Sequence, residues 1–194
     1  MRLGFLRHGD VAGAAHVYRG VTDTPLNDAG WQQMRAFVAA MPGWQTVVSS
    51  PLVRCADFAR DYARHHNVKC TLDAVWRELD FGAWEGLRPT DVAAHDPAAH
   101  GMFTESPRGN PPPGGESLDA FDARIHAALH ALGDAATQPT LIVTHAGVMR
   151  AVLAEVLGLA DDYRARIALT PGSGFVLSWL AGAPPLLMEL RCAA

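Results

Sequence analysis

The chain contains little lysine, little cysteine and no long hydrophobic run. Lys69 is its only lysine, and no G-x-x-x-x-G-K segment is present, which excludes a Walker-type nucleotide site. The three cysteines are odd in number and widely spaced, which argues against a disulfide scaffold and a structural zinc site and favours a reducing compartment. No apolar stretch approaches the length of a membrane span, and the apolar run at the start is too short for a signal peptide. We therefore expect a cytoplasmic protein without a membrane partner.

An excess of positive charge is also missing. The 194 residues carry a net charge of −4 at pH 7, with 49% hydrophobic and 19% charged residues. These values are ordinary for a soluble globular protein, and the negative sign does not favour nucleic acid as a partner. An anionic ligand must therefore be attracted by a local cluster of arginines. The length, with no internal repeat, predicts one domain over residues 1–194.

Short apolar runs alternate with stretches of helical spacing. One helix is expected after Asn27, which suits the N-cap position, and another from Ser50-Pro51, where a capping hydroxyl precedes a proline at the first helical position. Further helices are expected at 118–132 and after Gly147, and strands at 3–6, 46–49, 75–79, 140–144, 175–180 and 186–190. This alternation predicts an α/β fold, a three-layer α/β/α sandwich with a mostly parallel central sheet.

The segment from Leu87 to Gly115 differs from the rest of the chain. It is rich in Pro, Gly and His, its helical patterns are weak, and it ends in P-P-P-G-G, a stiff stretch followed by a flexible one. We expect a loop-rich insertion in the domain. A lid over a site and an inert surface loop are both compatible with this composition.

Charged or ionisable side chains follow three of the expected strands. Arg7 and His8 end the first strand, Arg54 lies in the first turn of the helix after the second, and His145 follows the strand at 140–144. The carboxyl edge of an open α/β sheet is where ligands bind. Two arginines can hold a phosphoryl group through forked hydrogen bonds, and two histidines add a nucleophile and a second donor. Since no conventional metal-ligand set accompanies them, the pattern indicates phosphoryl chemistry in which arginines take the place of a metal ion.

Five motifs follow one another along the chain: L-R-H-G from residue 6, S-S-P-L-x-R from 49, R-E-L-D-F-G-x-W-E-G from 77, G-G-E-S from 114 and T-H-A-G-V from 144. In this order they resemble the histidine phosphatase superfamily, which includes the phosphoglycerate mutases and related phosphatases. The resemblance extends from Met1 to about Leu180 and implies a phosphoglycerate mutase-like fold. The compact length and the segment Y-R-G-V-T-D-T-P-L-N are most similar to small phosphomonoesterases of the α-ribazole phosphatase type.

The resemblance implies roles for the residues at the sheet edge. His8 would be the nucleophile and form a phosphohistidine, with its other ring nitrogen hydrogen-bonded to the backbone. Arg7, Arg54 and His145 would hold the phosphoryl oxygens and stabilise charge during transfer. Ala146, next to His145 in its motif, is expected to contact the phosphate as well. The resemblance implies no cofactor and no metal ion.

A carboxylate would serve as general acid, protonating the leaving alcohol, and then as the base that activates water. From the residues alone, Glu78, Asp80 and Glu85 all remain open for this role. The family motif selects Glu78, and we interpret Glu85 as structural.

The sequence departs from the family pattern after R-H-G. Asp10, Val11 and Ala14 stand where many members carry a glutamate, a hydroxyl residue and a further polar residue. We therefore expect one of the family's phosphate contacts to be missing. Arg19 is a candidate to compensate for it, and a solvated loop arginine is the alternative interpretation. Two other histidines, His126 and His130, are four apart on one helix, but they lack a third zinc ligand and are interpreted as a surface pair.

These observations favour a metal-independent phosphomonoesterase that acts through phosphohistidine on a small phosphate ester, with α-ribazole 5′-phosphate, of cobalamin nucleotide-loop assembly, as the favoured candidate. A phosphoglycerate mutase is disfavoured because 87–115 holds no lysine and only the isolated Arg88 and Arg108. A broad-specificity phosphatase and, in a different class, a catalytically weak phospholigand-binding protein remain as alternatives. We expect Tyr18 and Phe103, together with these two arginines, to face the body of the substrate. We expect the protein to be a monomer or a homodimer.

Overall fold

A mixed six-stranded sheet forms the centre of the structure, a computed structural model that describes residues 1–180 and 182–192. The strand order is β3-β2-β4-β1-β5-β6. Strands β1 to β4 are parallel to one another, whereas β5 is antiparallel to β1 and β6 is antiparallel to β5. The strands are β1 (Arg2–Arg7), β2 (Thr46–Ser49), β3 (Lys69–Leu72), β4 (Thr140–Thr144), β5 (Gly174–Ser178) and β6 (Leu186–Arg191).

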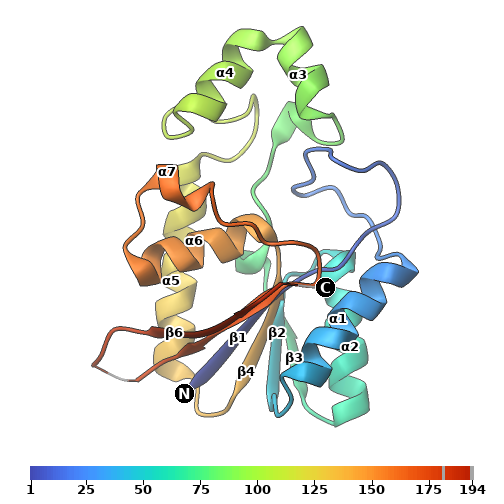
Figure 1. Ribbon diagram of the computed structural model, residues 1–194, viewed down its shortest axis with the longest axis vertical. Helices are drawn as coiled ribbons and strands as arrows, with labels where there is room; N and C mark the ends of the chain where they lie inside the picture. The colour runs from blue at the N-terminus through green and yellow to red at the C-terminus, as the bar shows by residue number, and fades with distance from the viewer. Residues whose placement is uncertain (181, 193–194) are drawn as a thin grey trace.

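Helices cover both faces of the sheet (Figure 1). The long helices α1 (Asp28–Ala40) and α2 (Val53–His66) pack on one face, and α5 (Leu118–Ala135) and α6 (Ala146–Leu157) pack on the other. The three short helices are α3 (Pro89–His95), α4 (Pro97–Glu105) and α7 (Asp161–Arg164). The predicted three-layer α/β/α sandwich with a mostly parallel sheet is confirmed.

The two central strands supply apolar side chains to both cores. In β1, Leu3 and Phe5 pack with α5 and α6, while Leu6 belongs to the core under α1 and α2. In β4, Ile142 likewise faces the first core and Leu141 the second. A strand buried on both faces has no need of polar alternation, so its sequence is a continuous apolar run. These are the two strands whose ends carry Arg7 and His145.

The strand expected at 75–79 is not formed, and an edge strand precedes it. Residues Ala74–Trp76 form a 3-10 turn, capped by the Asp73 carboxylate, which accepts from the Val75 N–H (3.0 Å). The strand at this position is Lys69–Leu72, at the edge of the sheet next to β2. Its side chains are alternately exposed and half-buried, so it lacks the apolar run by which the other strands are recognised.

Helix α2 begins at Val53, three residues later than the predicted capping hydroxyl at Ser50. Leu52 occupies the N-cap position without a side-chain bond, and the Val53 N–H donates to the Asp23 carboxylate at 2.6 Å. The Ser50 hydroxyl instead lies 2.8 Å from His145 Nε2. The predicted cap at Ser50 is wrong, because this hydroxyl accepts from the Leu52 N–H (3.3 Å), ahead of the first turn of the helix, and also contacts His145.

The insertion at 87–115 contains two helices, α3 and α4, where only weak helical pieces were expected. They lie beyond the edge of the sheet, at the top of Figure 1. Tyr18 attaches them to the body, because its hydroxyl lies 2.9 Å from His100 Nε2 and its ring contacts Phe103. The return loop is fixed by Arg108, which binds three carboxylates, those of Asp119, Asp122 and Asp161. Arg108 therefore holds the insertion in place and does not face a substrate, contrary to our expectation.

We predict that Asp122→Asn lowers the free energy of unfolding by about 3–5 kcal/mol, the usual effect of breaking a buried ion pair. The Asp122 side chain is only 7% exposed and also pairs with Arg164, which is 9% exposed. The matched control is Asp119→Asn, because Asp119 binds the same Arg108 but is 67% exposed. This control should cost less than about 1 kcal/mol. Urea unfolding measures both, and equal losses would contradict the assignment.

Candidate active site

Three strand ends bring the predicted residues together at the carboxyl edge of the parallel strands. β1 ends at Arg7 and β4 ends at Thr144, and the two strands are hydrogen-bonded neighbours. The backbone N–H of His8 donates to the Thr144 carbonyl at 2.9 Å, which continues the ladder one residue past β1. The rings of His8 and His145 then lie edge to face, with 5.3 Å between their centroids.

The His8 ring is held in one tautomer. Its Nδ1 lies 2.8 Å from the carbonyl oxygen of Gly9, which can only accept, so Nδ1 carries the hydrogen and Nε2 keeps its lone pair. Burial lowers the pKa of His8 well below its ordinary value of 6.5, and the charges of Arg54 and Arg7 lower it further. The imidazole is therefore neutral at pH 7, as a nucleophile must be. The backbone hydrogen bond predicted for this ring is confirmed.

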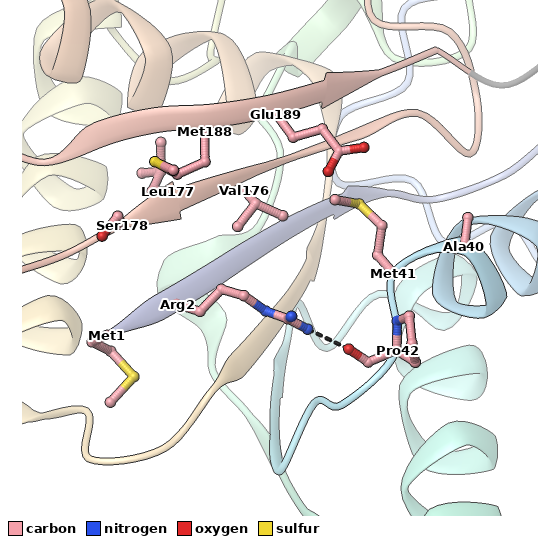
Figure 2. A pocket seen from close by; sticks show the side chains of 10 residues that line it. All are labelled: Met1, Arg2, Ala40, Met41, Pro42, Val176, Leu177, Ser178, Met188 and Glu189. Atoms are coloured by element: carbon pink, nitrogen blue, oxygen red, sulfur yellow. Dashed lines mark hydrogen bonds between the residues drawn. The ribbon is translucent and has the colours of Figure 1, made fainter.

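A cavity of about 540 Å³ opens in front of His8. Arg7, Glu78 and Arg19 share its wall with His8, as do the rings of Tyr18, Phe81 and Pro171 and the loop at 9–19. Of the aromatic and cationic residues expected to face the substrate, Tyr18 lines this cavity, whereas Phe103, Arg88 and Arg108 do not. A second hollow of about 550 Å³ lies at the opposite end of the sheet (Figure 2). It contains none of the predicted site residues, and its arginine, Arg2, is bonded to the Pro42 carbonyl and stacked on Trp44.

The Glu78 carboxylate lies at the N-terminus of α6. Oε2 accepts from the Gly147 N–H and Oε1 from the Leu79 N–H, each at 3.0 Å. A Cβ at Gly147 would lie 2.2 Å from Oε1, so the glycine of T-H-A-G-V is required for this close approach. Free N–H groups and the helix dipole make a helix N-terminus a suitable place for a carboxylate.

The three carboxylates that the sequence left open have different surroundings. Glu85 accepts hydrogen bonds from the N–H groups of Gly20, Val21, Thr22 and Phe81, and thereby fixes two loops. Asp80 accepts from the Gly82 N–H at 2.8 Å. Only Glu78 of the three lines the cavity with His8. The structural interpretation of Glu85 is confirmed.

Arg54 and His145 are fully buried and do not line the cavity. The Arg54 guanidinium donates to the carbonyls of Thr22 (2.8 Å) and Gly20 (2.6 Å), and its Nε donates to His145 Nδ1 (3.3 Å). Since Nδ1 accepts, Nε2 carries the hydrogen of the neutral ring and donates to the Ser50 hydroxyl. Burial and the charge of Arg54 lower the pKa of His145 well below 6.5. Ala146, the first residue of α6, is half-buried beside this ring.

Two arginines with different surroundings lie on the cavity wall. Arg7 is partly buried and donates to the Leu169 carbonyl, and burial lowers its pKa. Arg19 is more exposed and donates to the Ala14 carbonyl at 2.7 Å, so it is held at the position where the family's polar residue is missing. Its proposed role in binding phosphate stays a prediction. Asp10, another departure from the pattern, exchanges two hydrogen bonds of 2.9 Å with Gln33 of α1.

Sequence reasoning missed several residues around the site. Arg150 on α6 is half-buried and donates to the Ile167 carbonyl at 3.0 Å; burial lowers its pKa while the charge of Glu78 opposes that shift. Its signal in the sequence was its place on the helix expected directly after His145. Arg124, which contacts the backbone around Glu78, gave no signal beyond its place after G-G-E-S. His126 and His130 both approach Glu155, and the described residues include no group of three or more potential metal ligands.

The chain belongs to the histidine phosphatase superfamily. The family model described as Histidine phosphatase superfamily (branch 1) matches residues 3–188. The solved structure of a putative α-ribazole-5′-P phosphatase from Escherichia coli superimposes with a TM-score of 0.89, covering 100% of this chain and 97% of that one. At 22% sequence identity this likeness concerns the fold.

Curated relatives are similar over most of the chain. The Bifunctional protein Rv2228c of Mycobacterium tuberculosis is 34% identical over 177 residues, 89% of this chain but only 45% of that protein. Glucosyl-3-phosphoglycerate phosphatase of Mycolicibacterium vanbaalenii is 30% identical, over 83% of this chain and 76% of its own. Adenosylcobalamin/alpha-ribazole phosphatase of Salmonella typhimurium is 29% identical, over 81% and 80%. Within the described residues, no helix is long and apolar enough to cross a membrane.

We predict that the protein loses stability as the pH falls below 6.5. The unfolded chain binds a proton on His8 and on His145 near pH 6.5, whereas the folded chain does not, because both pKa values are lowered. The free energy of unfolding therefore has its full value above pH 6.5. At lower pH it decreases, by up to about 1.4 kcal/mol per pH unit for each histidine. Urea unfolding between pH 7.5 and 5.5 measures the slope.

His8→Gln should reduce this slope by about half, since one of two buried histidines is removed. The control is His95→Gln, which removes an exposed histidine and should leave the slope unchanged. A free energy of unfolding that stays constant or rises as the pH falls from 6.5 to 5.5 would contradict the neutral, buried state of both rings.

Proposed function

We propose that the protein is a metal-independent phosphomonoesterase that acts through a phosphohistidine at His8. The observation that carries the proposal is the neutral His8 ring on the cavity wall, with Nδ1 engaged by Gly9 and Nε2 left to react. Arg7 and Glu78 line the same cavity, so a phosphoryl-binding cation and a proton donor are available beside the nucleophile. Family membership supports the same chemistry.

The reaction takes two displacements at phosphorus. In the first, the Nε2 lone pair forms an N–P bond, the ester P–O bond breaks, and Glu78 transfers its proton to the leaving oxygen. The Nδ1–H bond to Gly9 stabilises the positive charge that the ring gains. In the second, Glu78 takes a proton from water, the water oxygen attacks phosphorus, and the N–P bond breaks. Phosphate leaves and both His8 and Glu78 return to their starting states.

Positive charge supports both displacements. Arg7 lies on the wall, where it can bind the phosphoryl oxygens and stabilise the charge that they carry during transfer. The His145 ring packs edge to face against the His8 ring, and Arg54 donates to His145 Nδ1. We assign them, with the Ala146 N–H at the start of α6, to the phosphoryl group once it is on His8. This contact requires the Ser50–His145 bond to be exchanged for one to phosphate.

Our favoured substrate is α-ribazole 5′-phosphate. Tyr18, Phe81 and Pro171 give the cavity flat apolar walls, which suit a phosphate ester with a planar, mostly neutral body. A compact doubly anionic sugar acid would need a cation for its second anionic end. Arg7 and Arg19 line the cavity, and we assign both to the phosphoryl group, whereas Arg88 and Arg108 of the insertion lie outside it. The relative named as an α-ribazole phosphatase adds support, although one named as a glucosyl-3-phosphoglycerate phosphatase is equally similar.

Glu78→Gln tests the assignment of the acid. We expect turnover of an alkyl phosphate to fall roughly 10²–10⁴-fold, the usual contribution of general acid–base catalysis. Turnover of p-nitrophenyl phosphate should fall much less, because its leaving group hardly needs a proton. The control, Asp80→Asn, removes a neighbouring carboxylate that lies outside the cavity. It should leave the turnover of both substrates nearly unchanged. Wild-type turnover should persist in EDTA. Loss of activity on chelation, or a larger effect of Asp80→Asn, would contradict the proposal.

A panel of phosphate esters compared by kcat/KM tests the substrate, because discrimination lies in that ratio. We expect α-ribazole 5′-phosphate and other nucleoside-like monophosphates to lead, with little interconversion of 2- and 3-phosphoglycerate. A lead for glucosyl-3-phosphoglycerate, or a panel in which p-nitrophenyl phosphate exceeds every metabolite, would reject the α-ribazole assignment. Either outcome would leave the chemistry at His8 intact.

A further inference from the structure

Glu78 stands in a segment that itself forms neither a strand nor a long helix. Residues 73–81 contain only the 3-10 turn Ala74–Trp76. Upstream of Glu78, the Thr144 hydroxyl donates to the Trp76 carbonyl at 2.8 Å and fixes the turn to the end of β4. The segment therefore depends on side chains from elsewhere to hold the carboxylate in its place at the α6 N-terminus.

One guanidinium makes most of these contacts. Arg124, on α5, donates through Nη1 to the carbonyls of Val75 and Arg77, the latter at 2.9 Å. Through Nη2 it donates to the carbonyl of Glu78 itself, at 3.2 Å. A single side chain thus binds three carbonyl oxygens within four residues and fixes the path of the backbone that carries the acid.

Glu116 holds that guanidinium in position. It accepts from Arg124 Nε (2.7 Å) and Nη2 (2.9 Å) in a forked pair whose side chains are mostly buried. The Phe121 ring lies under the guanidinium, 4.6 Å from it. The Glu116 N–H donates to the Asp80 carbonyl at 2.9 Å, and a Cβ on Gly115 would lie 2.5 Å from that oxygen. The loop of G-G-E-S therefore packs backbone against backbone just downstream of Glu78.

We propose that Arg124, braced by Glu116, is a positioning residue for Glu78. It touches neither the cavity nor the reacting atoms, and it acts by fixing the backbone on which the acid stands. The inference rests on the proposed role of Glu78 as general acid and base. A proton donor must lie within hydrogen-bond reach of the leaving oxygen, and a displacement of about 1 Å can cost on the order of 100-fold in rate.

The test compares leaving groups. Arg124→Gln should lower kcat/KM for an alkyl phosphate about 10- to 100-fold and for p-nitrophenyl phosphate much less, the same selective loss as in Glu78→Gln. The matched control is Arg77→Gln, an exposed arginine of the same segment that bonds only the Ala74 carbonyl, and it should change neither value. Glu116→Gln keeps the side-chain shape and should give a smaller loss of the same kind, which covers the case in which Arg124→Gln does not fold.

A double-mutant cycle with Glu78→Gln separates positioning from general stability. If Arg124 acts through the acid, adding Arg124→Gln or Glu116→Gln to Glu78→Gln should change turnover of the alkyl phosphate less than twofold. Equal losses for both substrates, or losses that multiply in the double variant, would overturn the inference and leave Glu78 as the acid. If Glu78→Gln itself shows no dependence on the leaving group, the acid assignment fails first and the inference with it.

Discussion

The hydrogen bond from His8 Nδ1 to the Gly9 carbonyl is the interaction on which the site depends. It decides which ring nitrogen keeps a lone pair, and it is formed within the residue pair that follows β1. Burial and two nearby arginines keep the ring neutral, so the same surroundings that would bind a phosphoryl anion also keep the nucleophile ready to attack. An exposed histidine at this sheet edge would be protonated over part of the physiological pH range, and its ring could rotate.

A cationic side chain in a protein interior is stable only if its N–H groups donate hydrogen bonds to acceptors. Arg54 meets this requirement with the carbonyls of Thr22 and Gly20 and with His145. The loop that provides these carbonyls is in turn held by Glu85. Arg124 repeats the arrangement next to the proposed acid, where it binds the carbonyls around Glu78 and pairs with Glu116. A buried or half-buried arginine thus binds the backbone next to the nucleophile and next to the proposed acid.

The sequence predicts much of this arrangement, since buried strands and their ends have strong local signals. β1 and β4 are continuous apolar runs, so the sequence alone places Arg7, His8 and His145 at one sheet edge. β3 gave no such signal because it is a half-exposed edge strand, and the strand expected at 75–79 is a 3-10 turn. The role of Arg108 was predicted wrongly and that of Arg124 was not predicted, because their partners are distant in sequence: Arg108 reaches Asp161, and Arg124 reaches residues 75–78.

The most direct test of the account is the position of phosphate in the trapped intermediate. Rapid quenching into alkali during turnover in EDTA, followed by mass spectrometry and phosphorus NMR, identifies the modified residue and the nitrogen. The account predicts one acid-labile phosphate on Nε2 of His8, because Nδ1 is bonded to Gly9. Phosphate on Nδ1, on another residue, or on no residue during active turnover would contradict it.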